Sequence, residues 1–176
     1  MQPGSEVHRL TEDERKALLK TIERIAHGRE VVSACAYGSR VAGYAKSDSD
    51  YDIILVLNKY RAKVRYRYVK FEVDASALLV DRSALLKDAE KSSLGEFVVG
   101  RLLNIYEPIL GEDFLQMVER IYKKRVILEL LDEILFNHKE FASELIINVD
   151  YFLFEKLKKR ATIYPPALYS YVKTYG

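Results

Sequence analysis

The stretch GSRVAGYAKSDSDYDIILVL, residues 38–57, decides the fold of this 176-residue chain. It follows the apolar run VVSACAY at residues 31–37, whose length and β-branched start are typical of a buried strand. It ends with YDIILVL, residues 51–57, the strongest strand pattern in the sequence. Between the two strands, we expect Ser39 to cap a short helix over about residues 40–45.

Two carboxylates, Asp50 and Asp52, stand at the start of the second strand. Because side chains alternate along a strand, both lie on one face, where like charges repel and unpaired burial is costly. A divalent cation resolves this conflict, since Mg²⁺ prefers oxygen ligands and keeps places for phosphate oxygens. The pair therefore predicts a metal site at the edge of the sheet.

A third carboxylate is expected from the extended segment at residues 64–80. Only residues 58–63 separate it from the preceding strand, which leaves no room for a crossover helix and predicts an antiparallel hairpin. Such a hairpin places either Asp74 or Glu72 opposite Asp52. Three convergent acids can hold two metal ions about 3.5–4 Å apart, the arrangement for in-line phosphoryl chemistry.

The Gly38-Ser39 pair is a candidate phosphate cradle, because it stands where a strand leads into the expected helix. Free backbone N–H groups and the positive end of a helix attract phosphate there, and glycine lets the backbone approach closely. Ser39 adds a hydroxyl group and Arg40 adds a positive charge. The chain thus places a phosphate site directly before a metal site.

This arrangement resembles the nucleotidyltransferase superfamily with the polymerase-beta-like fold, in its small, minimal members. The shared pattern is Gly-Ser, a short helix, an Asp-x-Asp strand and a third acid on a neighbouring strand. Here it reads GSRVAGYAKSDSDYDIILVL, followed by KFEVDASALLV. The resemblance covers about residues 30–80 directly, and it implies an α/β (α+β) fold with a small mixed sheet flanked by helices.

The resemblance also implies a reaction, in which a nucleoside monophosphate moves from a nucleoside triphosphate, expected to be ATP, to an acceptor and pyrophosphate is released. Two Mg²⁺ ions are implied as cofactors. The implied residues form a nucleotide-binding set, Gly38, Ser39 and Arg40, and a catalytic and metal-binding set, Asp50, Asp52 and Asp74. Asp74 would hold one metal and help to deprotonate the attacking hydroxyl. It is preferred to Glu72 because small and apolar residues follow it, as in the family's strand.

Helical patterns flank this region. The capping-box sequence Thr11-Glu12-Asp13-Glu14 predicts a helix to about residue 27, and a similar pattern at residues 93–96 predicts one over 97–103. Two long helical patterns follow at 114–135 and about 140–160, and Pro165-Pro166 is expected to end the second. We therefore predict a nucleotidyltransferase domain over residues 1–112 and a helical C-terminal segment over 113–176.

Composition excludes several classes of protein. The net charge of +2, from 28 basic and 26 acidic residues, excludes a uniform polycation. The single cysteine excludes a disulfide framework and a cysteine-rich zinc module. No apolar run approaches the roughly 20 residues that span a bilayer, and the N-terminus lacks the apolar centre of a signal peptide. We therefore expect a cytoplasmic protein with no membrane contact.

Two segments carry alternative interpretations. Residues 59–70, KYRAKVRYRYVK, hold six basic residues and no acid; they form either a surface for a nucleic-acid acceptor or a solvated hairpin that protects a sheet edge. The apolar stretch LIINVDYFLF, residues 145–154, is expected in an internal core, in a homo-oligomer interface between C-terminal helices, or in contact with a segment outside this sequence.

Three functions compete for the whole chain. The first is an enzyme that modifies RNA, a protein or a small molecule. The second is an antitoxin-type nucleotidyltransferase that acts on or binds a partner toxin, although the 64 residues after Glu112 make this chain long for that type. The third is a non-catalytic nucleic-acid-binding module, against which the intact acids Asp50, Asp52 and Asp74 argue.

Overall fold

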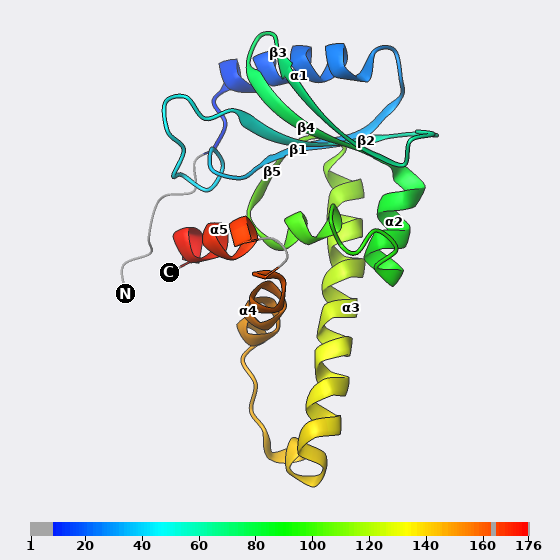
Figure 1. Cartoon of the computed structure of the whole chain (residues 1–176), viewed down its shortest axis with the longest axis vertical. Coiled ribbons are helices and arrows are strands. Elements are labelled where there is room, and N and C mark those ends of the chain that lie inside the picture. The colour runs from blue at the N-terminus through cyan, green and yellow to red at the C-terminus, as the bar shows by residue number, and fades with distance from the viewer. Residues whose placement is uncertain (1–8, 163–164, 176) are drawn as a thin grey trace.

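The computed structural model describes residues 9–162 and 165–175. Its centre is a five-stranded sheet in the order β3-β4-β2-β1-β5, with α1 on one face and α2 and α3 on the other (Figure 1). The strands are β1 (Val31–Tyr37), β2 (Tyr51–Leu57), β3 (Val64–Lys70), β4 (Asp74–Asp81) and β5 (Tyr106–Leu110). The α-helices are α1 (Glu12–Ala26), α2 (Arg82–Lys91), α3 (Glu112–His138), α4 (Val149–Arg160) and α5 (Pro165–Tyr175). The 3₁₀ helices are η1 (Val99–Leu103) and η2 (Lys139–Glu144). The predicted fold class is confirmed.

β2 is the central strand and is apolar on both faces. Ile53 and Leu55 pack in one core with α1, whereas Ile54 and Val56 pack in a second core with α2 and α3. A strand that is covered on both faces needs a continuous apolar run, which is why the sequence YDIILVL predicts a strand so clearly. The strand predictions at residues 31–37 and 51–57 are confirmed.

α1 begins at the predicted capping box. The Thr11 Oγ accepts a hydrogen bond from the Glu14 N–H at 3.3 Å, and the Glu14 carboxylate accepts one from the Thr11 N–H at 2.8 Å. The helix buries Leu18 and Ile22 against the sheet and ends at His27, which takes a left-handed conformation.

The predicted hairpin between β2 and residues 64–80 is wrong. That segment folds back on itself at residues 71–73, so that β3 pairs antiparallel with β4, which then pairs in parallel with β2. A single strand of this length would span about 56 Å, more than twice the length of β2, so the chain has to turn. The apolar β4 takes the interior place and the polar β3 the edge, because an interior strand is covered on both faces.

The predicted short helix over residues 40–45 is also wrong, because this segment forms only turns. The Ala42 N–H donates to the Gly38 carbonyl at 2.9 Å and the Tyr44 N–H donates to the Ser39 carbonyl at 3.0 Å, which makes a single turn. Gly43 then takes a φ of 78°, which an α-helix does not allow, and the turn stops there.

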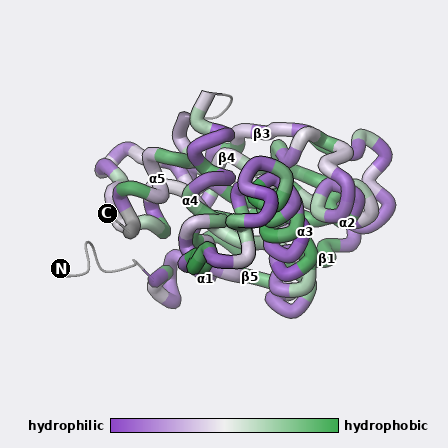
Figure 2. Tube along the Cα trace, turned by 90° about the horizontal axis from the view of Figure 1, so that it is seen from below, coloured by the Kyte–Doolittle hydropathy of each residue, from purple (hydrophilic) through white to green (hydrophobic). Residues whose placement is uncertain are grey.

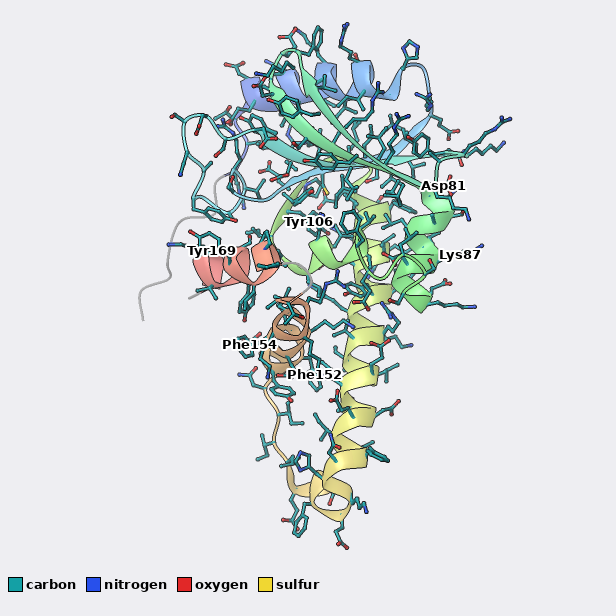
Figure 3. The ribbon with its side chains drawn as sticks, viewed as in Figure 1. Asp81, Lys87, Tyr106, Phe152, Phe154 and Tyr169 are labelled. Atoms are coloured by element: carbon teal, nitrogen blue, oxygen red, sulfur yellow. The ribbon has the colours of Figure 1, made fainter. Side chains whose placement is uncertain are left out.

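The pattern at residues 93–96 does not cap a helix. The capping position is taken by the buried Asp88 of α2, whose carboxylate accepts hydrogen bonds from the N–H groups of Leu94 at 2.8 Å and Glu96 at 3.0 Å. Residues 93–98 therefore form turns, and only η1 is helical. Two further elements were not predicted from the sequence: α2, which begins after its N-cap Asp81 (Figure 3), and β5, which pairs with β1.

α3 confirms the first long helical pattern. Its apolar and polar residues alternate around the helix (Figure 2), and Leu115, Val118 and Tyr122 share one core with Ile54 of β2. The helix runs away from the sheet (Figure 1), and Leu130 is its last buried residue. The proposed boundary at residue 112 coincides with the start of α3, and it stays a prediction.

The second long helical pattern is interrupted. η2 and an extended stretch at residues 145–148 precede α4, whose N-cap is Asn148. Pro165 begins α5 instead of ending the preceding helix, since the first turn of a helix tolerates proline. Within the described residues, no helix is both long enough and apolar enough to cross a membrane.

Candidate active site

The start of β2 places the predicted acids at one edge of the sheet. In the antiparallel pairing of β1 and β2, Asp52 lies opposite Tyr37, the last residue of β1. In the parallel pairing of β2 and β4, Asp52 lies beside Ser76. Residues that are paired in this way point to the same face, so Tyr37, Asp52 and Ser76 form a row across three strands. This row lies on the face that carries α2, α3 and η1.

Gly38 follows β1 directly and lies against Asp52. Its φ of 78° lies in the left-handed region, which favours glycine. A Cβ atom at this position would stand 2.3 Å from Asp52 Oδ2, which is well inside van der Waals contact. The Gly-Ser turn and the Asp-x-Asp strand, predicted separately from the sequence, are therefore in contact.

Asp50 and Asp52 share a face and influence one another. The Ser76 hydroxyl donates a short hydrogen bond to Asp50 Oδ2. Burial, and then the charge of Asp50, raise the pKa of Asp52 to about 6, against the opposing effect of Arg101. A carboxylate held in this way gains from a nearby cation, which would remove the cost of its charge. The pair offers only oxygen donors, the ligands that Mg²⁺ prefers.

Asp74 lies at the same edge of the sheet, on the neighbouring strand. The parallel register of β2 and β4 makes it the neighbour of Asp50, one position before the first registered pair. Its carboxylate accepts a hydrogen bond from Tyr68 Oη at 3.1 Å and lies 3.4 Å from Lys70 Nζ. Asp74 therefore faces the same side of the sheet as Asp50 and Asp52, but its carboxylate contacts Tyr68 and Lys70 of β3.

Glu72 points elsewhere. It lies in the turn between β3 and β4, and its carboxylate is 3.2 Å from Lys20 Nζ of α1, on the opposite side of the sheet. The prediction that Asp74 or Glu72 stands opposite Asp52 is wrong, because β4 runs parallel to β2 and brings Ser76 there. Among residues 9–162 and 165–175, no group of three or more His, Cys, Asp or Glu residues is arranged to hold a metal ion. The role of Asp74 as third ligand stays a prediction.

Arg40 braces the loop between β1 and β2. Its Nε donates to the Ser49 carbonyl at 2.9 Å, and its guanidinium group stacks over the Tyr51 ring at 4.6 Å from the centroid. The Tyr51 hydroxyl in turn donates to a Glu14 carboxylate oxygen at 2.5 Å. These contacts hold the segment that leads to Asp50, so the structure uses Arg40 to position the acids; its predicted role at the triphosphate stays untested.

A pocket beside Asp52 contains residues that the sequence analysis missed. Gly38, Ser39 and Asp52 line it together with Arg101 and Asn104 at the end of η1. Arg101 is 7% exposed, donates to Tyr37 Oη at 3.1 Å and stacks on Phe97 at 4.3 Å. It therefore brings a buried cation to the place where the Gly-Ser turn meets Asp52. A single arginine after an apolar stretch carries no sequence signal of such a role.

Asn104 carries an unusual feature in this pocket. Its amide nitrogen donates to the Ala167 carbonyl at 3.2 Å. Its Oδ1 is the one buried side-chain polar atom without a hydrogen-bond partner among the residues that the structure describes. An unsatisfied buried acceptor is costly and needs an explanation. A ligand that donates a hydrogen bond here would satisfy it.

α5 supplies the far wall of the same pocket. Pro166, Ala167 and Ser170 line it, although they are more than 60 residues beyond Arg101 in the chain. The Tyr169 ring (labelled in Figure 3) meets the Tyr44 ring edge to face, with centroids 5.4 Å apart. α5 is thus part of the pocket.

One family of known proteins matches part of the chain. Residues 20–100 match the family model described as polymerase beta, nucleotidyltransferase. This part of the chain is a polymerase-beta-like nucleotidyltransferase domain. The match includes Gly38, Ser39 and all three predicted acids. A search of curated proteins returned no match.

The nucleotidyltransferase domain is tied to the C-terminal helices through Glu96. Its buried carboxylate lies 2.6 Å from Arg125 of α3, and 2.9 and 2.6 Å from Lys156 and Arg160 of α4. Burial opposes ionisation, but these cations outweigh it and hold the pKa of Glu96 below its ordinary value. Gly100 makes room for this contact, since a Cβ atom there would lie 2.9 Å from Arg160 Cζ. α4, which leads into α5, is therefore fixed relative to the pocket.

Proposed function

We propose that the protein is a Mg²⁺-dependent nucleotidyltransferase that moves a nucleoside monophosphate from a nucleoside triphosphate to a hydroxyl acceptor and releases pyrophosphate. The observation that carries the proposal is the direct contact between the Gly38 backbone and the Asp52 carboxylate in a pocket that also holds Arg101. A phosphate cradle and a cation-binding carboxylate must lie side by side for in-line transfer at a phosphorus atom.

The chain's own residues would divide the work. The backbone around Gly38 and the Ser39 hydroxyl would hold the triphosphate, with Arg101 as a further positive charge beside them. Asp50 and Asp52 would hold Mg²⁺, and Asp74 would approach from β4 as third ligand and help to deprotonate the acceptor hydroxyl. When bound, Mg²⁺ ions would neutralise the charge that develops on the phosphate oxygens.

The acceptor belongs to this proposal as well. RNA, a protein or a small molecule could each offer a hydroxyl group, and a protein acceptor would include the antitoxin-type activity on a partner toxin. We propose ATP as the donor and a cytoplasmic location. We also propose self-association through the C-terminal helices and the stretch that joins them, where Phe141, Ile146 and Val149 are 67%, 102% and 71% exposed.

The test is transfer of a labelled nucleotide. Purified protein is incubated with each of the four α-labelled nucleoside triphosphates, Mg²⁺, and either cellular RNA or cellular protein. We expect label in one acceptor fraction, loss of the reaction in EDTA, and a loss of at least a hundredfold in Asp50→Asn and in Asp52→Asn.

Asp48→Asn is the matched control, because Asp48 is an exposed carboxylate of the same loop. It should retain the wild-type rate. Equal transfer by Asp52→Asn and the wild type would refute the metal assignment, whereas no transfer by the wild type to any acceptor would refute the proposed activity.

A further inference from the structure

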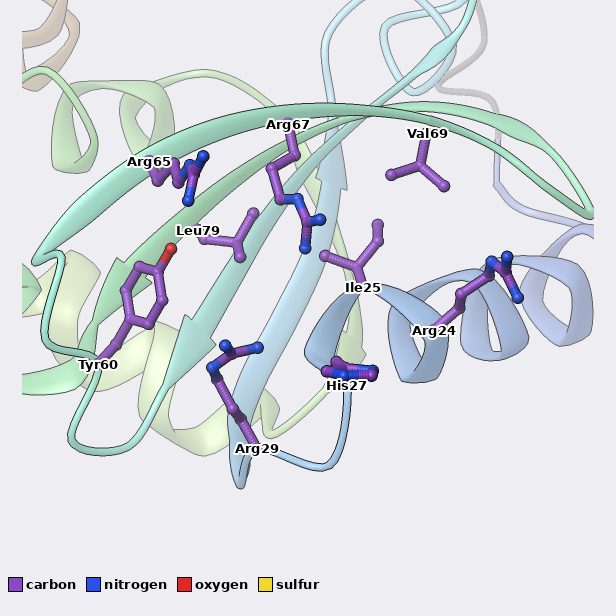
Figure 4. A pocket seen from close by; sticks show the side chains of 9 residues that line it. All are labelled: Arg24, Ile25, His27, Arg29, Tyr60, Arg65, Arg67, Val69 and Leu79. Atoms are coloured by element: carbon purple, nitrogen blue, oxygen red, sulfur yellow. The ribbon is translucent and has the colours of Figure 1, made fainter.

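A second pocket lies on the opposite face of the sheet, between β3 and the turn that joins α1 to β1 (Figure 4). It is a cavity of about 490 Å³, within the range of about 300–1,000 Å³ for ligand sites, and four of its nine lining residues are arginines: Arg24, Arg29, Arg65 and Arg67. His27 also lines it, and none of the nine is acidic. Figure 4 shows Arg65 and Arg67 reaching from β3 toward Arg29 and His27 across the cavity.

The arginines of this pocket lack carboxylate partners within the described parts of the chain. The side chains of Arg65 and Arg67 form no hydrogen bond or ion pair there, and both residues are exposed. Arg24 stacks over Phe71 at 4.8 Å, and Arg29 donates to the Ala26 carbonyl at 3.0 Å. Like charges that face one another across a cavity repel. An anion bound in the cavity would therefore relieve this electrostatic repulsion, which no carboxylate of the described residues relieves.

The pocket also has an apolar floor and an aromatic wall. Ile25 of α1 and Leu79 of β4 form the floor, and the Tyr60 ring stands at one end (Figure 4). A floor of this kind suits the flat, weakly polar face of a nucleic-acid base, and a tyrosine ring offers a stacking surface. A pocket for a small inorganic anion would not need these features.

The positive surface continues beyond this pocket. Arg29, Tyr60 and Arg65 also line a neighbouring cavity of about 440 Å³ around the β2–β3 turn. Its one acidic lining residue, Glu30, accepts a hydrogen bond from the Asn58 amide at 2.8 Å. Tyr60 borders a third cavity, of about 410 Å³, that is lined by four basic residues, Lys59, Arg61, Lys63 and Lys87, and by one acid, Asp81. The Asp81 carboxylate accepts hydrogen bonds from the N–H groups of Tyr60 and Ser83. The three cavities share lining residues and therefore adjoin one another around the β2–β3 turn, which favours a chain of phosphates over a single one.

From these observations, we infer that the arginine pocket and its continuation around the β2–β3 turn bind single-stranded nucleic acid, through the phosphate backbone and by base stacking on Tyr60. The site is separate from the candidate active site. β3 pairs Arg65 and Arg67 with Leu79 and Ala77, which belong to the core under α1, whereas the acids face the other core. Of the two interpretations of the basic hairpin, this inference adopts the nucleic-acid surface.

Fluorescence anisotropy tests the inference in EDTA and without nucleoside triphosphate, so that catalysis does not enter. The probes are single strands of RNA and of DNA of about 12 nucleotides, within the span of about 4–16 that such surfaces cover. We expect binding that weakens with salt, and a loss of at least tenfold in Arg65→Gln/Arg67→Gln. The slope of log K against log salt should fall in magnitude by about 1.4, since each lost phosphate contact contributes about 0.7.

Two further variants make the result specific. Lys91→Gln/Lys124→Gln removes the same charge from exposed positions on α2 and α3 and should change binding less than twofold. Arg65→Lys/Arg67→Lys keeps the charge and should restore most of the binding, and thermal unfolding checks that all variants fold. Three outcomes would each overturn the inference. They are equal losses of binding in the two glutamine variants, a mononucleotide that binds as tightly as the strand, and no binding of either the RNA or the DNA strand. Tighter binding of RNA than of DNA, or the reverse, would support the inference and show which nucleic acid the site binds.

Discussion

Gly38 of the β1–β2 loop and Asp52 of β2 are in contact, with the Asp52 carboxylate occupying the space that a side chain at Gly38 would need. The two residues are 14 positions apart in the chain and meet because β1 and β2 are antiparallel neighbours. A triphosphate bound at the Gly38 backbone would therefore lie directly beside Asp52.

Gly38→Ala should abolish nucleotide transfer while the fold persists. The added Cβ would stand 2.3 Å from Asp52 Oδ2, so either the turn or the carboxylate must move. We expect a fall in rate of at least a hundredfold, measured by labelled nucleotide transfer. Gly28→Ala is the control, because Gly28 has a similar φ of 75° and nothing within 4 Å of its Cβ position. If the two variants lose activity equally, the contact with Asp52 is not the cause.

Asp52→Asn should stabilise the metal-free protein above about pH 6. Between the ordinary pKa of 3.8 and the folded pKa of about 6, the folded state holds a proton that the unfolded state has released. The free energy of unfolding of the wild type therefore falls as the pH rises through this range, and Asn removes the effect. The gain should reach at most about 3 kcal/mol at pH 8, since one pKa unit corresponds to about 1.36 kcal/mol.

Urea unfolding in EDTA at pH 4 and pH 8 measures this gain. The wild type and Asp52→Asn should have similar stabilities at pH 4 and diverge at pH 8, and added Mg²⁺ should narrow the gap by stabilising only the wild type. Parallel stability profiles for the two proteins would contradict the raised pKa.

Arg101→Gln should weaken binding of the nucleoside triphosphate. Arg101 brings a buried positive charge to the pocket that Gly38 and Asp52 share, and charge-assisted hydrogen bonds to phosphate are strong. We expect KM for the triphosphate to rise at least tenfold. Arg120→Gln removes an exposed arginine of α3 and should leave KM unchanged. An unchanged KM in Arg101→Gln would show that Arg101 only supports Tyr37.

Glu96→Gln should destabilise the protein by about 3 kcal/mol, because removal of one partner from a buried ion pair leaves unpaired charge. Arg160 would lose the carboxylate that it contacts, whereas Arg125 and Lys156 would keep only the more exposed Glu129. Thermal unfolding measures the effect. Glu12→Gln is the control: its contact with Lys16 is exposed and 3.9 Å long, so the change should stay below about 0.5 kcal/mol. Equal stability of the two variants would contradict a central role for Glu96.

The sequence predicted the local elements well where one physical signal dominated. The Thr11 capping box set the start of α1, and the continuous apolar run at 51–57 identified the central strand. It failed where a local pattern competed with a distant partner. Glu96 resembles a capping residue, but its carboxylate is drawn to cations on α3 and α4, and Asp88 caps the turn instead.

Along the chain, the sequence alone determined the order of the chemistry: a Gly-Ser turn, then Asp50 and Asp52 on one strand face. These depend on period-two geometry and on backbone freedom at glycine, which are local properties. Only the tertiary structure decided that Ser76 lies beside Asp52, that Arg101 and α5 complete the pocket, and that the arginines and tyrosines of β3 face opposite sides. Strand order depends on which segment can be buried on both faces. The apolar β4 therefore lies next to β2 inside the sheet, and β3 lies at the edge.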